Sequence, residues 1–286
     1  MVALTGRAEY GMEALRAENI DRAIKGIAMR AYVLRNAVTI SKTNAASDSY
    51  YRETQAILGA SSEIARGASF PIGTTEWLKF NNAQKKQGVQ EVIPWEDEVS
   101  NNIDVVSRLM IKMGEAMAKV EDDNIYAALI AGRDTDNDVT VATNFEWNSA
   151  TRADRHPQDA IGQAIENITT NTSYKPDTVI VNPKDYNLLL TNDDLVDAWT
   201  TAGSNPLATG AIQKLMGLNV LVSNAVAADI ALVVQSKMCA TMRVLQPLRT
   251  AVIKNEGIKT LVRAYASSSV FVTDPGAIAR ISNTNV

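Results

Sequence analysis

The stretch from Trp77 to Gly132 decides the fold, and it reads WLKFNNAQKKQGVQEVIPWEDEVSNNIDVVSRLMIKMGEAMAKVEDDNIYAALIAG. Its first part is polar and extended, and it runs without a hydrophobic break into one long amphipathic helix. Apolar side chains recur along that helix at alternating spacings of three and four, which places them on one narrow stripe. The stripe consists of Ile103, Val106, Met110, Met113, Met117 and Val120. The opposite face consists of Arg108, Lys112, Glu115, Lys119 and Asp122.

The ends of this helix are marked in the sequence. Asn101 can cap the start, Asp104 lies in the first turn, and Gly132 is placed to end the helix. A helix of roughly thirty residues reaches about 45 Å at 1.5 Å per residue. Such a strut, with a polar arm in front of it, indicates a building block that reaches toward neighbouring molecules.

Composition excludes several classes of protein. The 286 residues are 46% hydrophobic, which suits a soluble protein with a real core. A single cysteine and a single histidine exclude a disulfide framework and a Cys/His zinc site within one chain, and they suit a reducing compartment. No apolar run approaches the roughly twenty residues that span a bilayer, and the first ten residues lack a signal pattern, so we expect neither export nor membrane insertion.

Charge argues against a dedicated nucleic-acid binder. The net charge is -4, and the longest basic cluster is Lys85 and Lys86. Phosphate contacts need clustered lysine and arginine, so we expect weak, non-specific DNA binding. The exception would be an N-terminal helix, whose basic residues could touch phosphates. These are Arg16, Arg22, Lys25, Arg30 and Arg35.

The remaining pattern predicts a mixed α+β chain. Helical spacing predicts a helix over 19–36, and 39–71 is expected to be extended, with room for two strands. A short strand pair is expected over 139–147. Further helices are expected over 157–170, 183–190 and 206–216, and strands over 178–181, 220–222, 231–234 and 242–252. Residues 258–281 alternate apolar and polar side chains, with a turn at Asp274-Pro275-Gly276.

Candidate chemical sites have simpler structural interpretations. Three alternating aspartates have the spacing that opens a calcium loop, and they are Asp134, Asp136 and Asp138. The glycine position of that loop is occupied by Val139 and its closing glutamate position by Phe145, which favours a solvated turn.

Two further candidates lie at predicted helix starts. His156 has no G-x-S-x-G nucleophile to serve and is interpreted as a surface turn residue. Asn182-Pro183-Lys184-Asp185 could hold an anion, but a helix cap with proline in the first turn explains it.

Cys239 is interpreted as a small core residue rather than as a nucleophile. The methionines at 110, 113 and 117 are interpreted as core packing rather than as a groove that binds many partners. Neither a G-x-G-x-x-G motif nor a P-loop is present. We therefore predict no catalytic, cofactor-binding or metal-binding residue and no enzyme activity. A rival interpretation, a small α/β enzyme over 151–250, has one histidine and no partner motif.

The order of these elements resembles the major capsid proteins of tailed double-stranded DNA bacteriophages, which share the Hong Kong 97-type fold. Four stretches carry the resemblance. Lys85 to Glu98 resembles the return strand from the extended loop, and Ile103 to Leu129 resembles the spine helix. Pro176 to Tyr186 is similar to the strand-then-helix element of the axial domain. Gly217 to Ser223, with Val270 to Arg280, is similar to the return into the peripheral domain.

The resemblance implies an α+β Hong Kong 97-type capsid fold with a specific division of the chain. Residues 1–45 would form the N-terminal arm, 46–93 the extended loop, 94–150 with 251–286 the peripheral domain containing the spine helix, and 151–250 the axial domain. Lysines such as Lys79 lie in the loop, but no matching cross-link site can be placed.

The resemblance also implies a function and partners. The chain would be a viral major capsid protein that self-assembles, as hexamers and pentamers, into an icosahedral shell around double-stranded DNA. Its partners would be further copies of itself and separate scaffolding, portal and decoration proteins, with assembly in the host cytoplasm and no cofactor. An encapsulin-like nanocompartment shell, which encloses enzyme cargo, is the alternative.

Overall fold

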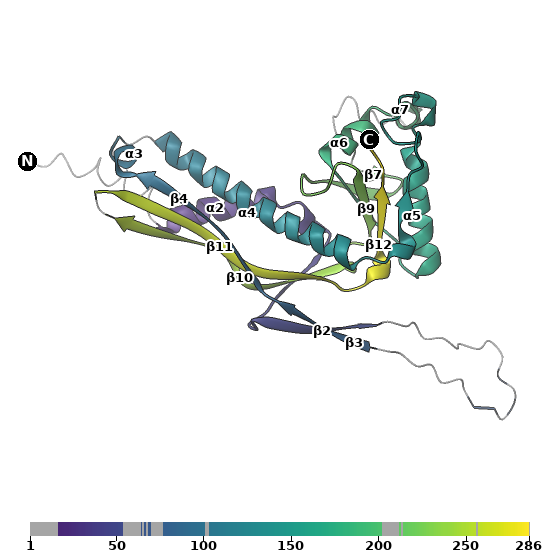
Figure 1. Cartoon of the computed structure of the whole chain (residues 1–286), viewed down its shortest axis with the longest axis horizontal. Helices are drawn as coiled ribbons and strands as arrows, with labels where there is room; N and C mark the ends of the chain where they lie inside the picture. Colours follow the sequence, from purple (N-terminus) through teal and green to yellow (C-terminus); the bar gives the residue numbers. More distant parts are fainter. Residues whose placement is uncertain are drawn as a thin grey trace, which may run out of the picture.

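The computed structural model describes residues 17–53, 64, 66, 68–69, 77–100, 103–201, 212, 214–255 and 257–285. Its strands form sheets of four, six and two strands. One long helix runs along the four-stranded sheet and ends beside the six-stranded sheet, while the two-stranded sheet projects away from both (Figure 1). Helices and strands are mixed along the chain, so the predicted α+β class is confirmed.

The four-stranded sheet has the order β1-β10-β11-β4. Its strands are β1 (Thr39–Lys42), β4 (Lys85–Pro94), β10 (Ala240–Asn255) and β11 (Lys259–Val272). β1 pairs in parallel with β10, and the other pairs are antiparallel. Because side chains alternate along a strand, Val262 and Ala264 of β11 are buried while Arg263 between them faces outward.

The helix α4 (Ile103–Gly132) confirms the predicted strut of 30 residues. Asn101 and the side chains of Ile103, Asp104 and Val106 lie outside the described part of the chain. Gly132 is the last helical residue, and a Cβ there would lie 2.6 Å from Cγ2 of Val272. The helix therefore ends where it passes too close to β11 for a side chain.

The predicted apolar stripe is correct only over part of α4. Met113 and Met117 are buried, but Val120 is exposed and Asp122 is buried. From Met113 onward the buried row follows steps of four, through Met117, Glu121, Ile125 and Leu129. Each step of four residues rotates about 40° beyond one full turn, so the buried row drifts around the helix axis. The prediction that Asp122 lies on the solvent face is therefore wrong, because a second element packs over it.

That element is the N-terminal segment. The expected helix over 19–36 is divided into α2 (Ala17–Ala31) and the 3₁₀ turn η1 (Leu34–Asn36). Ile20, Ile24 and Ala28 pack with Met113 and Met117 in one hydrophobic cluster. A Cβ on Gly114 would lie 2.8 Å from Cγ2 of Ile27, so glycine allows the two helices to approach closely.

The six-stranded sheet has the order β5-β12-β9-β6-β8-β7. Its strands are β5 (Val139–Thr140), β6 (Thr178–Val181), β7 (Lys214–Leu215), β8 (Leu218–Val222), β9 (Ile230–Val234) and β12 (Ile278–Ser282). α5 (Pro157–Asn171), α6 (Pro183–Leu190) and α7 (Asp193–Thr201) belong to this half of the molecule (Figure 1). The predicted α5, α6, β6, β8 and β9 are confirmed, with small shifts at their ends.

The central strand β6 is buried on both faces and joins two cores. Val179 and Val181 pack with Ile161 and Ile168 of α5. Ile180, on the other face, belongs to a cluster that contains residues of α4 and of the four-stranded sheet. That cluster includes Ile125, Leu129, Met242 and Val272. The two larger sheets are thus connected through the C-terminal half of α4.

Several sequence predictions fail locally. The predicted helix over 206–216 falls partly on undescribed residues, and its described end is β7 followed by a turn with positive φ at Met216 and Gly217. The strand pair over 139–147 is only β5, preceded by η2 (Thr135–Asn137). α7 was missed. The short helix α3 (Trp95–Val99) interrupts the expected continuous entry into α4. Two further 3₁₀ turns complete the described structure, η3 (Arg152–Asp154) and η4 (Pro275–Ala277). η4 lies at the turn predicted from Asp274-Pro275-Gly276.

Candidate assembly surfaces

The two-stranded sheet is an antiparallel hairpin that leaves the body of the molecule. It consists of β2 (Ser47–Glu53) and β3 (Trp77–Ala83), and Tyr51 lies opposite Lys79 in its register. Tyr51, Trp77 and Leu78 are exposed, and the ammonium group of Lys79 lies 6.0 Å from the centre of the Tyr51 ring. Isolated two-stranded hairpins are marginally stable in water, so this arm needs support at its base and contacts farther out.

The base of the hairpin is held by stacked aromatic rings. The Tyr50 ring lies 4.0 Å from that of Phe271 and 5.5 Å from that of Phe80, centre to centre, and both pairs are nearly parallel. Aromatic pairs of this kind add to the free energy of burial. Phe271 belongs to β11, so the stack connects the projecting hairpin to the four-stranded sheet.

Polar contacts fix the same junction. The guanidinium of Arg52 donates to the carbonyl of Val272 at 2.9 Å, and the amide of Asn82 donates to the carbonyl of Val270 at 3.1 Å. The Gln84 amide donates to Asp48 Oδ2 and to Ser269 Oγ, each at 3.0 Å. Three hydrogen bonds and a ring stack to one strand therefore set the direction in which the hairpin points.

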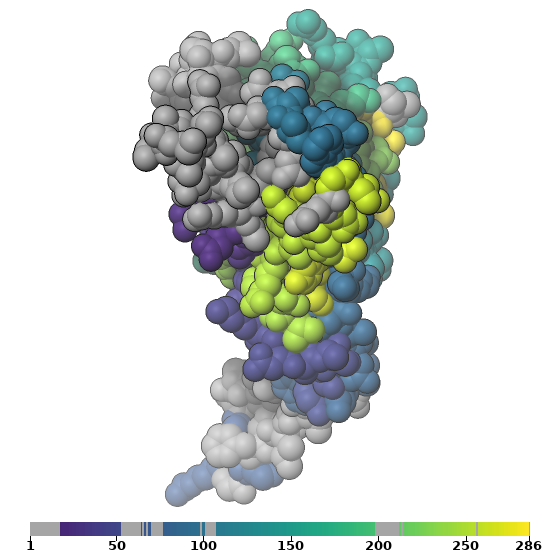
Figure 2. Space-filling view, turned by 90° about the vertical axis from the view of Figure 1, so that its left-hand side faces the viewer, coloured from purple at the N-terminus to yellow at the C-terminus, as the bar shows by residue number. Residues whose placement is uncertain are grey.

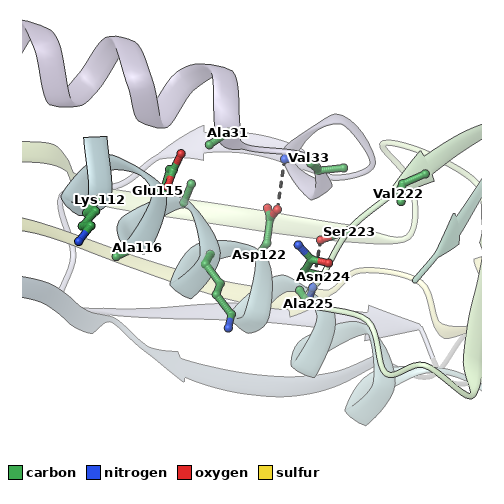
Figure 3. Close-up of a pocket in the computed structure, with 12 residues that line it drawn as sticks. Ala31, Val33, Lys112, Glu115, Ala116, Asp122, Val222, Ser223, Asn224 and Ala225 are labelled. Carbon is green, nitrogen blue, oxygen red and sulfur yellow. Dashed lines mark hydrogen bonds between the residues drawn. The ribbon is translucent and has the colours of Figure 1, made fainter. Parts of the chain in front are cut away.

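A second candidate region lies where α2, α4 and the loop after β8 meet. A cavity of 450 Å³ is lined by Val33, Lys112, Lys119, Asp122, Asn224 and Ala225, among others (Figure 3). The Asp122 carboxylate accepts hydrogen bonds from the backbone N–H groups of Val33 and Leu34, each at 3.2 Å. Burial raises the pKa of Asp122 to about 6, although these two N–H donors act in the opposite direction.

Arg35 stabilises the same junction from the side. It forms a two-pronged ion pair with Glu121, in which Nη2 donates to Oε2 at 2.8 Å, and its guanidinium lies 3.6 Å from the centre of the Tyr32 ring. This arrangement locks the turn between α2 and β1 onto α4. It does not form an acid–base pair aimed into the cavity, and we assign the cavity no chemistry.

The residues singled out for metal binding do not converge. Asp134 caps η2 by accepting from the N–H of Asp136 at 3.1 Å. Asp138 is not solvated as expected, because it forms ion pairs with Arg133 at 2.9 Å and with Arg280 at 3.0 Å. Across the described part of the chain, no group of three acidic, histidine or cysteine side chains is placed to hold a metal ion.

The other candidates take structural positions. His156 is partly exposed just before α5, with Nδ1 3.4 Å from Asp194 Oδ2. Asn182 caps α6 by accepting from the N–H of Lys184 at 2.9 Å. Asp185 is buried and accepts from Thr284 and Asn285, and its burial raises its pKa to about 6. Cys239 is fully buried in the shared core, which raises its pKa to about 12 and makes it a poor nucleophile.

Some basic residues of the N-terminal helix are exposed, and others form ion pairs within the chain. Arg22 and Arg30 of α2 are exposed. Lys25 pairs with Asp21, and Arg35 pairs with Glu121, while Arg16 lies outside the described residues. No helix in the described ranges is long and apolar enough to cross a membrane.

Comparison with known proteins gives a family and a fold. A family profile described as "Phage capsid protein" matches residues 81–281. No curated protein matches the chain significantly. Among solved structures, the capsid of cyanophage P-SCSP1u is 17% identical, with a TM-score of 0.66 and coverage of 89% of both chains.

Two further structures are similar. Mycobacterium phage Che8 is 16% identical with a TM-score of 0.66, covering 89% of this chain and 92% of that chain. The capsid of a native GTA particle is 14% identical with a TM-score of 0.65, covering 89% and 91%. At these identities the structures establish the fold, which is the Hong Kong 97-type capsid fold. An encapsulin-like shell is not favoured over a phage capsid by these matches.

Proposed function

The chain belongs to the phage capsid protein family, as a viral major capsid protein, and from that premise we propose that its copies form the hexamers and pentamers of an icosahedral shell around double-stranded DNA. The observation that carries the proposal is the projecting hairpin. Its base is fixed to β11 by Tyr50 and Arg52, while Tyr51, between these two residues, and Trp77, farther out, are more than half exposed. An arm built in this way gains its apolar partners from an adjacent subunit.

We also propose the division of the chain into an N-terminal arm (1–45), an extended loop (46–93), a peripheral domain (94–150 and 251–286) and an axial domain (151–250). α4 and the four-stranded sheet support the peripheral domain, and the six-stranded sheet supports the axial domain. Strand pairing favours one refinement. β5 and β12 pair within the six-stranded sheet, so 139–150 and 278–285 group with the axial domain. β10 pairs within the four-stranded sheet, so 240–250 groups with the peripheral domain.

In this proposal the subunit is structural and not an enzyme, and it needs no cofactor. Separate scaffolding, portal and decoration proteins would complete the particle, which would be assembled in the host cytoplasm. DNA would be contacted weakly and without sequence preference. The net charge of -4 supports confinement rather than tight binding, because every strong phosphate contact would oppose packing and release.

Electron microscopy and light scattering of the purified protein test the proposal. We expect rings or closed shells, and particles that contain DNA when purified from infected cells. A Trp77→Ser variant should fold and lose shell yield, whereas the matched variant Phe145→Ser, which removes an exposed aromatic ring remote from the hairpin, should assemble normally. A strictly monomeric wild-type protein across concentration, salt and crowding conditions would contradict the proposal.

A further inference from the structure

The last described strand of the chain lies inside a sheet instead of at its edge. β12 has β5 on one side and β9 on the other, and it pairs in parallel with β5 and antiparallel with β9. Ile278, Ala279 and Ile281 of this strand are fully buried. Ala279 and Ile281 belong to the core of the six-stranded sheet, whereas Ile278 belongs to the core shared with α4. One strand therefore completes both cores, and we call residues 278–285 the closing segment.

The residues that follow β12 are held by polar contacts. The Asn283 amide donates to the carbonyl of Val141 at 2.8 Å, and the carbonyl of Thr284 accepts from the N–H of Trp147 at 2.9 Å. The hydroxyl of Thr284, which is fully buried, donates to Asp185 Oδ2 at 3.1 Å. The contact to Val141 spans 142 residues of sequence and the contact to Asp185 spans 99, so each of them closes a long loop.

The segment 139–148 depends on the closing segment for its position. β5 is an edge strand, and among the described strands it pairs with β12 alone. The N–H of Val141 donates to the carbonyl of Ser282 at 3.0 Å. The Trp147 ring is 2% exposed and packs in the same core as Ile281. Because each segment supplies backbone partners and apolar cover to the other, we expect the two to become ordered together.

The closing segment also connects the two halves of the molecule. These halves lie one behind the other in Figure 2, with the yellow-green strands β10 and β11 in front and the fainter green and teal atoms of the six-stranded half behind them. Arg280 of β12 pairs with Asp138 at 3.0 Å, and Asp138 also pairs at 2.9 Å with Arg133, which follows the last residue of α4. Docking of the closing segment therefore helps to fix the direction of the long helix relative to the six-stranded sheet.

We propose that the closing segment docks last during folding, together with 139–148, and that its docking makes the subunit competent to assemble. Contacts between residues far apart in the sequence form late, because the entropy of closing a long loop is lost before the contacts are gained. A shell repeats one subunit geometry many times, and a subunit whose halves are not fixed relative to each other does not present that geometry. A chain with an undocked closing segment is thereby kept out of the shell. This inference rests on the proposed shell function and adds a folding step that precedes assembly.

The first test measures the folding and unfolding rates of the unassembled full chain. Thr284→Val removes the hydroxyl that donates to Asp185 and keeps the shape of the side chain. The unfolding rate should rise about fivefold or more and the refolding rate should stay within about twofold of wild type, because contacts made after the rate-limiting step affect unfolding alone. Thr169→Val, which removes an exposed hydroxyl on α5, is the matched control and should change neither rate. An unchanged unfolding rate in Thr284→Val, or a refolding rate lowered beyond that limit, overturns the proposal.

The second test follows docking and assembly in the same sample. Wild-type chains that refold under assembly conditions receive a short pulse of deuterium at increasing times, and the labels of shells and of free subunits are then read by mass spectrometry. Chains in shells should be protected over 278–285 and 139–148, whereas chains still free at early times should be protected in β6 and open in both segments.

Two results of this experiment overturn the proposal. One is a shell built from chains whose closing segment is open, and the other is protection of β6 and of both segments at the same moment. If the wild-type protein forms no shells at all, the proposed function fails instead. The rates of the first test still decide in that case whether the closing segment docks last, so the two failures are distinguishable.

Discussion

Replacing Asp122 by Asn should reduce the pH dependence of subunit stability. Burial raises the pKa of Asp122 from 3.8 to about 6 in the folded chain. The folded state therefore holds the proton at pH values where the unfolded state has lost it. Stability from this group is complete below about pH 4 and is lost as the pH rises through 6. Between about pH 5 and about pH 7.5 one such carboxyl group changes the free energy of unfolding by about 1.4 kcal/mol.

The asparagine variant keeps an oxygen that can accept from Val33 and Leu34 but cannot ionise. Urea unfolding of unassembled subunits, followed by tryptophan fluorescence at the two pH values, measures the effect. As the pH rises, the wild type should lose stability through both Asp122 and Asp185, because the pKa of Asp185 is also raised to about 6. The variant should lose only the part that comes from Asp185. Asp123→Asn, on the exposed neighbour, is the control and should behave as wild type. The reasoning is refuted if Asp122→Asn and wild type show the same pH dependence.

Three further predictions concern packing, the hairpin and DNA. Met113→Asp puts an unpaired carboxylate between α2 and α4 and should lower the free energy of unfolding by about 3–5 kcal/mol, which would appear as insoluble or unfolded subunit. Ile111→Asp, on the exposed face of α4, is the control and should be tolerated. Tyr50→Ala removes the stack on Phe271 and should lower shell yield, while Tyr50→Phe keeps the stack and the yield; equal yields would count against the anchor. In a salt titration, free subunits should bind duplex DNA weakly and more weakly as salt rises, and tight sequence-specific binding would contradict this.

Local signals carried the correct predictions. The periodic apolar residues of α4, the apolar run of β6 and the Asn182-Pro183 start of α6 are each contained within a few residues, so the sequence is enough to read them. A similar signal was available for α7. Asn192 accepts from the N–H of Leu195 at 3.1 Å, and two aspartates follow it in the first turn.

Contacts between distant segments could not be predicted in this way. Asp122 looks like a solvated helix residue until Val33 and Leu34, 89 and 88 residues away in the sequence, each donate a backbone N–H group to it. The anchor of the hairpin depends on Tyr50 meeting Phe271, and nothing near either residue marks the other.

The burial of β6 on both faces has a mechanical consequence. The core around Ile180 and Leu129 ties the C-terminal half of α4 to both larger sheets, so neither half of the subunit can shift without disturbing packed side chains of the other. A shell that holds compressed DNA pulls on its subunits along the plane of the wall. In this molecule that tension would pass through a close-packed core instead of through a flexible linker. Mutations that open a cavity at Ile180 or Leu129 should therefore weaken the resistance of the shell to rupture more than they lower its assembly yield.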